Sequence, residues 1–133
     1  MLTATQIMQK TPLSRRRGSE YVRIKEVKLV KKGERRIARA KTSSTHDING
    51  NKKAGGFTTY VTSVEPLGRY VKISCTCDDF LFTWEYALEK QGAADINYSN
   101  AEPPIEKNPR LIGGSCKHLY KFLSLLKSRS IVK

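Results

Sequence analysis

Long apolar runs are missing from this chain of 133 residues. No segment approaches the ~18 consecutive apolar residues that cross a bilayer, so we expect no membrane-spanning helix and no membrane partner. The chain also lacks a Gly-rich phosphate loop, a pair of carboxylates in a catalytic context and a recognisable secretory signal at its start. These absences predict a non-enzymatic protein without a small-molecule substrate, in a reducing compartment such as the cytoplasm.

Cysteine is scarce as well, and its few copies are grouped. The three cysteines and one of the two histidines form two tight pairs, Cys75-Thr76-Cys77 and Cys116-Lys117-His118. Three thiolates and one imidazole complete the tetrahedral shell that structural zinc prefers, and a complete shell leaves no position for water or substrate. We therefore predict one structural Zn²⁺, held by Cys75, Cys77, Cys116 and His118.

The local sequence around each pair supports this prediction. Residues 69–75 alternate apolar and polar side chains as a strand does. Side chains two positions apart on a strand share a face, so Cys75 and Cys77 should aim at one point. The apolar residues after the second pair recur with helical spacing, at Leu119, Phe122, Leu123 and Leu126. Cys116 and His118 should lie in the first turn of that helix, where the helix dipole favours a thiolate.

Three other interpretations of these residues compete with zinc. A Cys-x-Cys pair is poorly placed to close a disulfide on itself, and pairing among three cysteines leaves one over. If the cysteines are only small buried apolar side chains, His118 is a surface residue. A nucleophile–base pair made of Cys116 and His118 has no orienting third group and leaves the other two cysteines unexplained.

The pattern Cys-x-Cys, a variable insertion and then Cys-x-His resembles the SWIM zinc finger. The resemblance covers residues 57–126, with an insertion at residues 78–115 that is longer than in many members. In that family the four ligands bind one zinc and the module serves DNA or protein interaction, which the resemblance implies here too. Segments such as Trp84-Glu85-Tyr86-Ala87-Leu88 and Asn108-Pro109-Arg110 also look like small SWIM proteins of tailed bacteriophages, which implies a phage setting.

The expected elements place four strands before the first ligand pair and two helices after it. Strand patterns cover residues 21–31, 35–41, 57–64 and 69–75. A bulge is expected between Ile24 and Val27, where the alternation slips. A helix is predicted from Phe80 to Gln91, capped by Asp78 or Asp79, with Trp84 in the core and Glu85 facing out. This is an α+β fold: a small antiparallel sheet of about four strands followed by two helices, with zinc joining a strand end to the C-terminal helix.

Positive charge is concentrated at the two ends of the chain. Residues 1–41 hold 13 Lys or Arg and 3 Glu, whereas residues 75–118 hold 4 basic and 7 acidic residues. Residues 1–20 are expected to form a basic arm that folds only on a partner, because the run from Lys10 to Arg17 offers little to bury, with Leu2, Ile7 and Met8 as an apolar anchor on that partner. Residues 21–133 are expected to form a single zinc-stapled domain. The candidate nucleic-acid-binding or partner-binding residues are Arg15, Arg16, Arg17, Arg23, Lys25, Lys28, Arg35 and Arg36.

Two functions are compatible with this distribution. In the first, the basic arm docks into a larger assembly of other protein subunits, as a virion component of a tailed phage (capsid, neck, tail or baseplate). In the second, the basic ends bind the phosphate backbone of DNA or RNA without reading its sequence. The remaining histidine, His46, lies in a polar loop without partner cysteines and is expected to be solvated.

Overall fold

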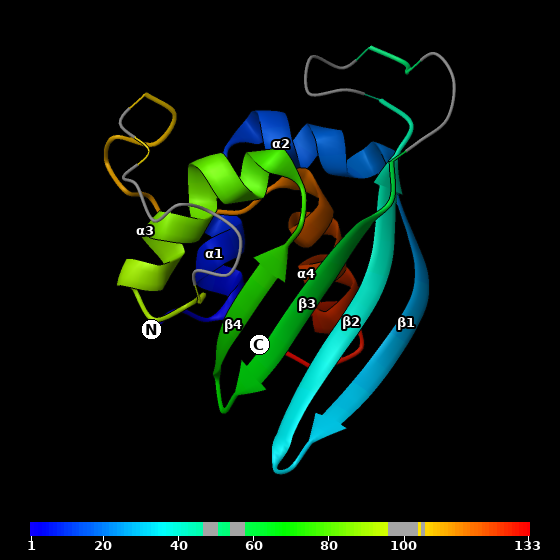
Figure 1. Ribbon diagram of the computed structural model, residues 1–133, viewed down its shortest axis with the longest axis vertical. Helices are drawn as coiled ribbons and strands as arrows, with labels where there is room; N and C mark the ends of the chain where they lie inside the picture. Colours follow the sequence, from blue (N-terminus) through cyan, green and yellow to red (C-terminus); the bar gives the residue numbers. More distant parts are fainter. Residues whose placement is uncertain (47–50, 54–57, 96–103, 105) are drawn as a thin grey trace.

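A four-stranded antiparallel sheet with helices packed on one of its faces forms the framework of the protein, in a computed structural model (Figure 1). The structure describes residues 1–46, 51–53, 58–95, 104 and 106–133. Its elements, in chain order, are α1 (Ala4–Lys10), α2 (Leu13–Gly18), the 3₁₀ turn η1 (Ser19–Tyr21), β1 (Val22–Lys32), β2 (Arg35–Ser44), β3 (Tyr60–Leu67), β4 (Tyr70–Cys75), the π-helical turn η2 (Phe80–Trp84), α3 (Glu85–Lys90) and α4 (Lys117–Ser128). The predicted α+β class is confirmed.

The strands pair in chain order, β1-β2-β3-β4, so the sheet is a simple meander. Gly33 and Gly68 take positive φ angles of 63° and 62° at the two hairpin tips, a conformation that glycine adopts without strain. The register of β1 against β2 shifts between Lys25 and Lys28, and Glu26 takes φ 53° at this point. Glycine therefore closes both hairpins, and the bulge predicted in β1 is present.

Helix α4 covers one face of the sheet and lies behind it in the view of Figure 1. Its fully buried side chains are the four with the predicted helical spacing, Leu119, Phe122, Leu123 and Leu126. The sheet contributes Val64, Val71 and Ile73 to the same hydrophobic core. The opposite side of the sheet, called the outer face below, carries Lys28, Arg39 and Ser63.

The N-terminal residues are part of the core, which corrects the expectation of an arm that folds only on a partner. Helix α1 begins with a capping box, in which Gln6 N donates to Thr3 Oγ1 (3.1 Å) and Thr3 N donates to Gln6 Oε1 (2.9 Å). Leu2 and Ile7 are buried in the same core as α4. The backbone of Val71 on β4 also donates a hydrogen bond to the Leu2 carbonyl (3.0 Å). Burial of apolar side chains and pairing to the edge of the sheet hold this segment in place.

The helix predicted after the first cysteine pair is present, but it begins with the π-helical turn η2. A π turn contains an extra residue, which rotates the residues that follow it about the helix axis. Glu85, expected to face solvent, is instead fully buried (0% exposed), and Trp84 lies in the core as predicted. Gly92, at φ 73°, ends this helical segment where the sequence indicated.

Candidate metal centre

The end of β4 presents the first ligand pair. Cys75 is the last residue of the strand, but pairing with β3 continues one residue further. Thr76 N donates to the Val61 carbonyl (3.2 Å), and Val61 N donates to Thr76 Oγ1 (3.0 Å). The alternation of the strand therefore reaches Cys77, and both cysteines are buried.

The second pair is fixed by the turn that precedes α4. Cys116 is the N-cap residue of α4, and His118 lies in its first turn, as predicted. A Cβ added to Gly114 would lie 3.1 Å from Thr11 Cα, so this turn packs closely against the end of α1. Ser115 N donates to Thr11 Oγ1 (3.1 Å). The N-terminal segment thus supports the backbone that presents Cys116.

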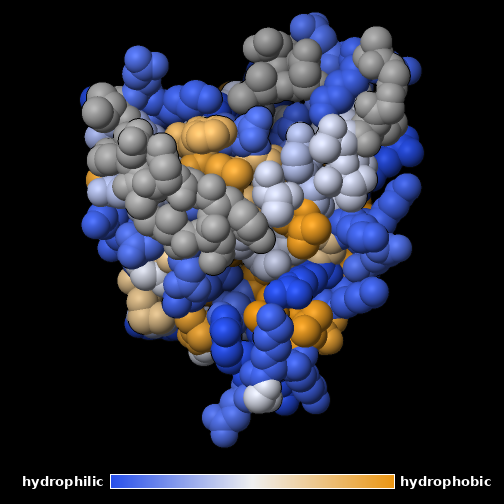
Figure 2. Space-filling model, in the orientation of Figure 1, coloured by the Kyte–Doolittle hydropathy of each residue, from blue (hydrophilic) through white to orange (hydrophobic). Residues whose placement is uncertain are grey.

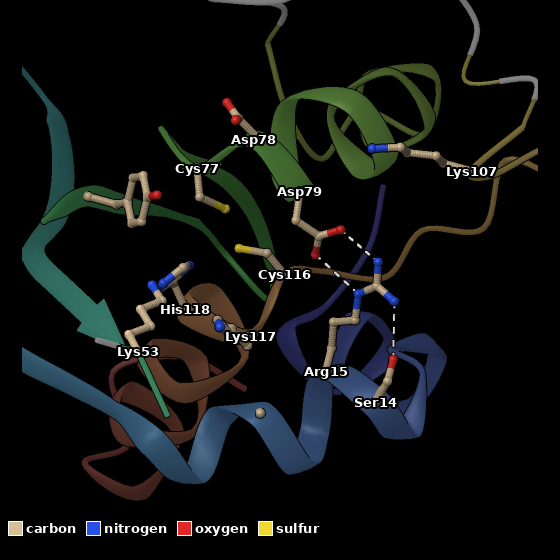
Figure 3. A pocket seen from close by; sticks show the side chains of 12 residues that line it. Ser14, Arg15, Lys53, Cys77, Asp78, Asp79, Lys107, Cys116, Lys117 and His118 are labelled. Atoms are coloured by element: carbon tan, nitrogen blue, oxygen red, sulfur yellow. Dashed lines mark hydrogen bonds and ion pairs between the residues drawn. The ribbon is translucent and has the colours of Figure 1, made fainter. Parts of the chain in front are cut away.

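Together, the four predicted ligands form one buried cluster. One ligand atom from each lies within 4.8 Å of the others, compared with about 3.8 Å between sulfurs in a closed tetrahedral zinc shell. The three cysteines are free of disulfides. In Figure 3 the sulfurs of Cys77 and Cys116 point toward one another, with the His118 side chain close to them.

The imidazole of His118 gives an independent indication of a metal. The side chain is buried (3% exposed), and neither ring nitrogen has a hydrogen-bond partner within the described residues. A buried polar nitrogen without a partner is costly, and a bond to a metal ion would remove this cost for one of the two. The donor set and the unpartnered imidazole therefore fit a metal ion.

Burial and mutual hydrogen bonding set the charge of the thiols. Burial raises the pKa of Cys75 and of Cys116, because a thiolate is poorly solvated there. Hydrogen bonds from Cys116 and Cys75 lower the pKa of Cys77 well below its usual range. Phe80 N also donates to Cys77 Sγ (3.4 Å), a contact that orients this sulfur. A divalent cation would favour the thiolate form of all three cysteines.

A cavity of about 320 Å³ opens beside the cluster and is lined in part by α2 and by Asp78 and Asp79, which precede η2 (Figure 3). On its wall, Arg15 Nη2 and Nε donate to the two carboxylate oxygens of Asp79 (2.6 and 3.1 Å). Asp79 was a predicted helix cap, but its carboxylate accepts from Thr83 Oγ1 and Trp84 Nε1 instead (3.2 Å each). Arg15 therefore ties α2 to the segment after the first ligand pair, rather than projecting into solvent.

The eight predicted partner-binding residues do not form one surface. Arg16 donates to the backbone carbonyls of Thr11 and Gln9 (2.8 and 2.6 Å). Arg35 forms a bidentate pair with Glu65, with distances of 2.7 and 2.9 Å. Five of the eight are exposed and have no ion pair within the described residues: Arg17, Arg23, Lys25, Lys28 and Arg36. Arg15 and Arg16 thus have structural roles, and the exposed residues lie on α2 and along the β1–β2 hairpin.

Sequence reasoning missed the contacts that Tyr60 and His46 make with residues of the second ligand segment. The ring of Tyr60 lies 4.9 Å from that of His118, and burial raises the pKa of Tyr60. His46 was expected to be solvated but is half-buried, with its ring stacked on Tyr21 at 3.7 Å. The His46 carbonyl also accepts a hydrogen bond from Lys117 Nζ (2.9 Å), in the first turn of α4. No local pattern marks either residue, because each contact joins segments distant in sequence.

No family model, curated protein or solved structure that was compared with this chain matches it. The resemblance to SWIM fingers and to phage proteins therefore rests on the motif residues alone. The geometry itself establishes a buried Cys/His cluster able to hold one metal ion, consistent with a zinc finger. Within the described residues, no helix is long and apolar enough to cross a membrane.

Proposed function

We propose that the protein is a non-enzymatic zinc-stapled module of the SWIM type, in which one Zn²⁺ joins the end of β4 to the start of α4. The buried Cys₃His cluster is the observation that carries this proposal. Thiolate and imidazole ligands suit zinc, whereas Mg²⁺ and Ca²⁺ prefer oxygen ligands. Four protein ligands fill a tetrahedral shell, so the metal would stabilise the fold and would not act on a substrate.

The position of the cluster explains why a metal would matter to this fold. The ligand pairs lie on either side of residues 78–115, a segment that contains η2, α3 and the turn before α4. Structural zinc contributes about 10–16 kcal/mol of apparent folding free energy in small metal-dependent domains. In a domain with 28% charged residues and a modest apolar core, such a link would contribute a large part of the folding stability.

The partners that fit this module are other protein subunits of a larger assembly. The resemblance to small phage proteins suggests a virion component, and otherwise the reducing cytoplasm suits three free thiols. Since Leu2 and Ile7 are buried in the core, docking would use the surface of the folded domain and not a free arm.

Metal analysis of protein purified without added zinc tests the proposal. We expect one zinc per chain, loss of zinc and of folded structure in Cys77→Ser, and a milder effect in His118→Cys, because four cysteines also bind zinc. His46→Ala is the matched control, since it removes the other histidine and should keep the metal. A fully folded wild-type chain without metal would show that the cluster is not a zinc site.

A further inference from the structure

The outer face of the sheet concentrates positive charge on β1 and β2. Residues that are partners in the strand register share a face, so Lys28, Arg39 and Ser63 form a row across three strands, continued by Ser74 on β4. Figure 2, in the orientation of Figure 1, shows hydrophilic side chains along the β1–β2 hairpin and around its tip. Arg23, near the start of β1, adds a further positive charge to the outer face.

Like charges face one another directly on this surface. The three cross-strand pairs are Lys25–Lys41, Lys28–Arg39 and Lys32–Arg35. Such pairs destabilise a sheet. Two carboxylates offset part of this charge, since Glu26 binds Lys41 (2.8 Å) and Glu65 binds Arg35 (2.7 Å). The cations left without an ion pair within the described residues are Arg23, Lys25, Lys28, Lys32 and Arg39.

A hollow of about 340 Å³ lies within this charged surface. Arg39 and Lys32 line it together with Ser63 and Ser74, which are paired across β3 and β4. Its two carboxylates, Glu65 and Asp95, are already in ion pairs. Hydroxyl groups beside a guanidinium and an ammonium group are donors that suit the oxygens of a phosphate.

We propose that the outer face of the sheet binds the phosphate backbone of double-stranded nucleic acid without reading its sequence. Interfaces with nucleic acid are polar and strongly positive, whereas the cores of protein–protein interfaces are depleted in lysine and rich in aromatic residues. Within the described strands, Tyr70 is the one aromatic residue on this face, and the Arg69 guanidinium lies over its ring (4.9 Å). The face therefore lacks the stacking platform that single-stranded bases require.

This surface is separate from the metal cluster. Its unpaired cations lie on β1 and β2, whereas the ligands come from the end of β4 and the start of α4. Binding to a phosphate backbone would also relieve the repulsion between the like-charge pairs. The proposal goes beyond a structural role for zinc and does not rest on it.

Fluorescence anisotropy of a short labelled DNA duplex, titrated with the zinc-loaded full chain at several salt concentrations, tests the proposal. The test variant Lys28→Gln/Arg39→Gln removes two outer-face cations. The control variant Lys127→Gln/Arg129→Gln removes the same charges from the end of α4, which packs on the other side of the sheet. Each phosphate contact contributes about 0.9 to the slope of log K against log salt, so the test variant should lower the slope by about 1.8 and weaken binding by about tenfold or more at moderate salt.

The control variant should retain most of the wild-type affinity and slope. If both variants lost the same affinity for the duplex, net charge alone would drive binding and the proposal would be overturned. It would also be overturned if the wild type bound no duplex, preferred single-stranded DNA or bound an acidic polypeptide more tightly than the duplex. Both variants should keep their zinc. A loss of duplex binding can therefore be told apart from a loss of the metal site.

Discussion

Replacing Ile7 with alanine should destabilise the whole domain, although Ile7 lies in a segment whose composition suggests a basic tail. The Ile7 side chain is 0% exposed and belongs to the core shared with α4 and the sheet. The change removes three buried carbon atoms, and each loses about 0.8 kcal/mol of the free energy of transfer from water to the core. It also leaves a cavity, which adds to the cost. The expected loss is therefore about 2.5–5 kcal/mol, which corresponds to a fall of roughly 10 °C or more in the melting temperature.

Urea unfolding of the zinc-loaded protein measures this effect. Trp84 is the only tryptophan and lies in the same core, so its fluorescence reports on the packing that Ile7 supports. Leu13→Ala is the matched control in the same segment, because Leu13 is 58% exposed and its loss should cost less than about 0.5 kcal/mol. If Ile7→Ala and the control unfold at the wild-type urea concentration, the N-terminal residues do not belong to the core and the reasoning is refuted.

Charge on the sheet gives two further predictions. Lys28→Glu should raise the free energy of unfolding by about 0.2–1 kcal/mol, because it converts the like-charge pair with Arg39 into an opposite-charge pair. Thermal melting checks this, and Lys127→Glu on α4 should give no such gain. Glu65→Gln should flatten the pH dependence of stability in acid, because Arg35 holds the pKa of Glu65 below its ordinary value of 4.5. The ion pair of the wild type stabilises the fold above that value, and this contribution is lost as the pH falls through the lowered pKa of Glu65. The urea midpoints of the wild type and of Glu65→Gln should therefore converge in acid. A difference between the midpoints that stays constant with pH would contradict the role given to the Arg35–Glu65 pair.

Local patterns were enough to predict the sheet and the residues of the metal cluster. Alternation over residues 69–75 placed Cys75 at a strand end, and helical spacing after His118 located α4 and its buried face. The slip of the alternation between Ile24 and Val27 located the bulge in β1. These features depend on backbone geometry within a few residues, so they are visible without knowledge of distant contacts.

Local patterns failed at Glu85, which was expected to face solvent. Its side chain is fully buried, as are those of Trp84 and Leu88. Position 85 lies three residues before Leu88, so helical spacing allows it to share the buried face, and only the tertiary structure shows that a charged side chain is accepted there.

The sequence by itself determined which side chains can bind a metal, where strands and helices alternate and which segments are basic. Only the tertiary structure decided what the N-terminal residues do. Helix α1 has 7 residues, which is too few for a helix to be stable alone in water, so the segment needs contacts with the rest of the chain. It folds here because the core accepts Leu2 and Ile7, and because Thr11 bonds to Ser115 across 104 positions of the chain. The same holds for the outer face, since the lysines and arginines are evident in the sequence but only the strand register sets Lys28 opposite Arg39. Contacts of this kind depend on which distant surfaces meet, and no local pattern records that.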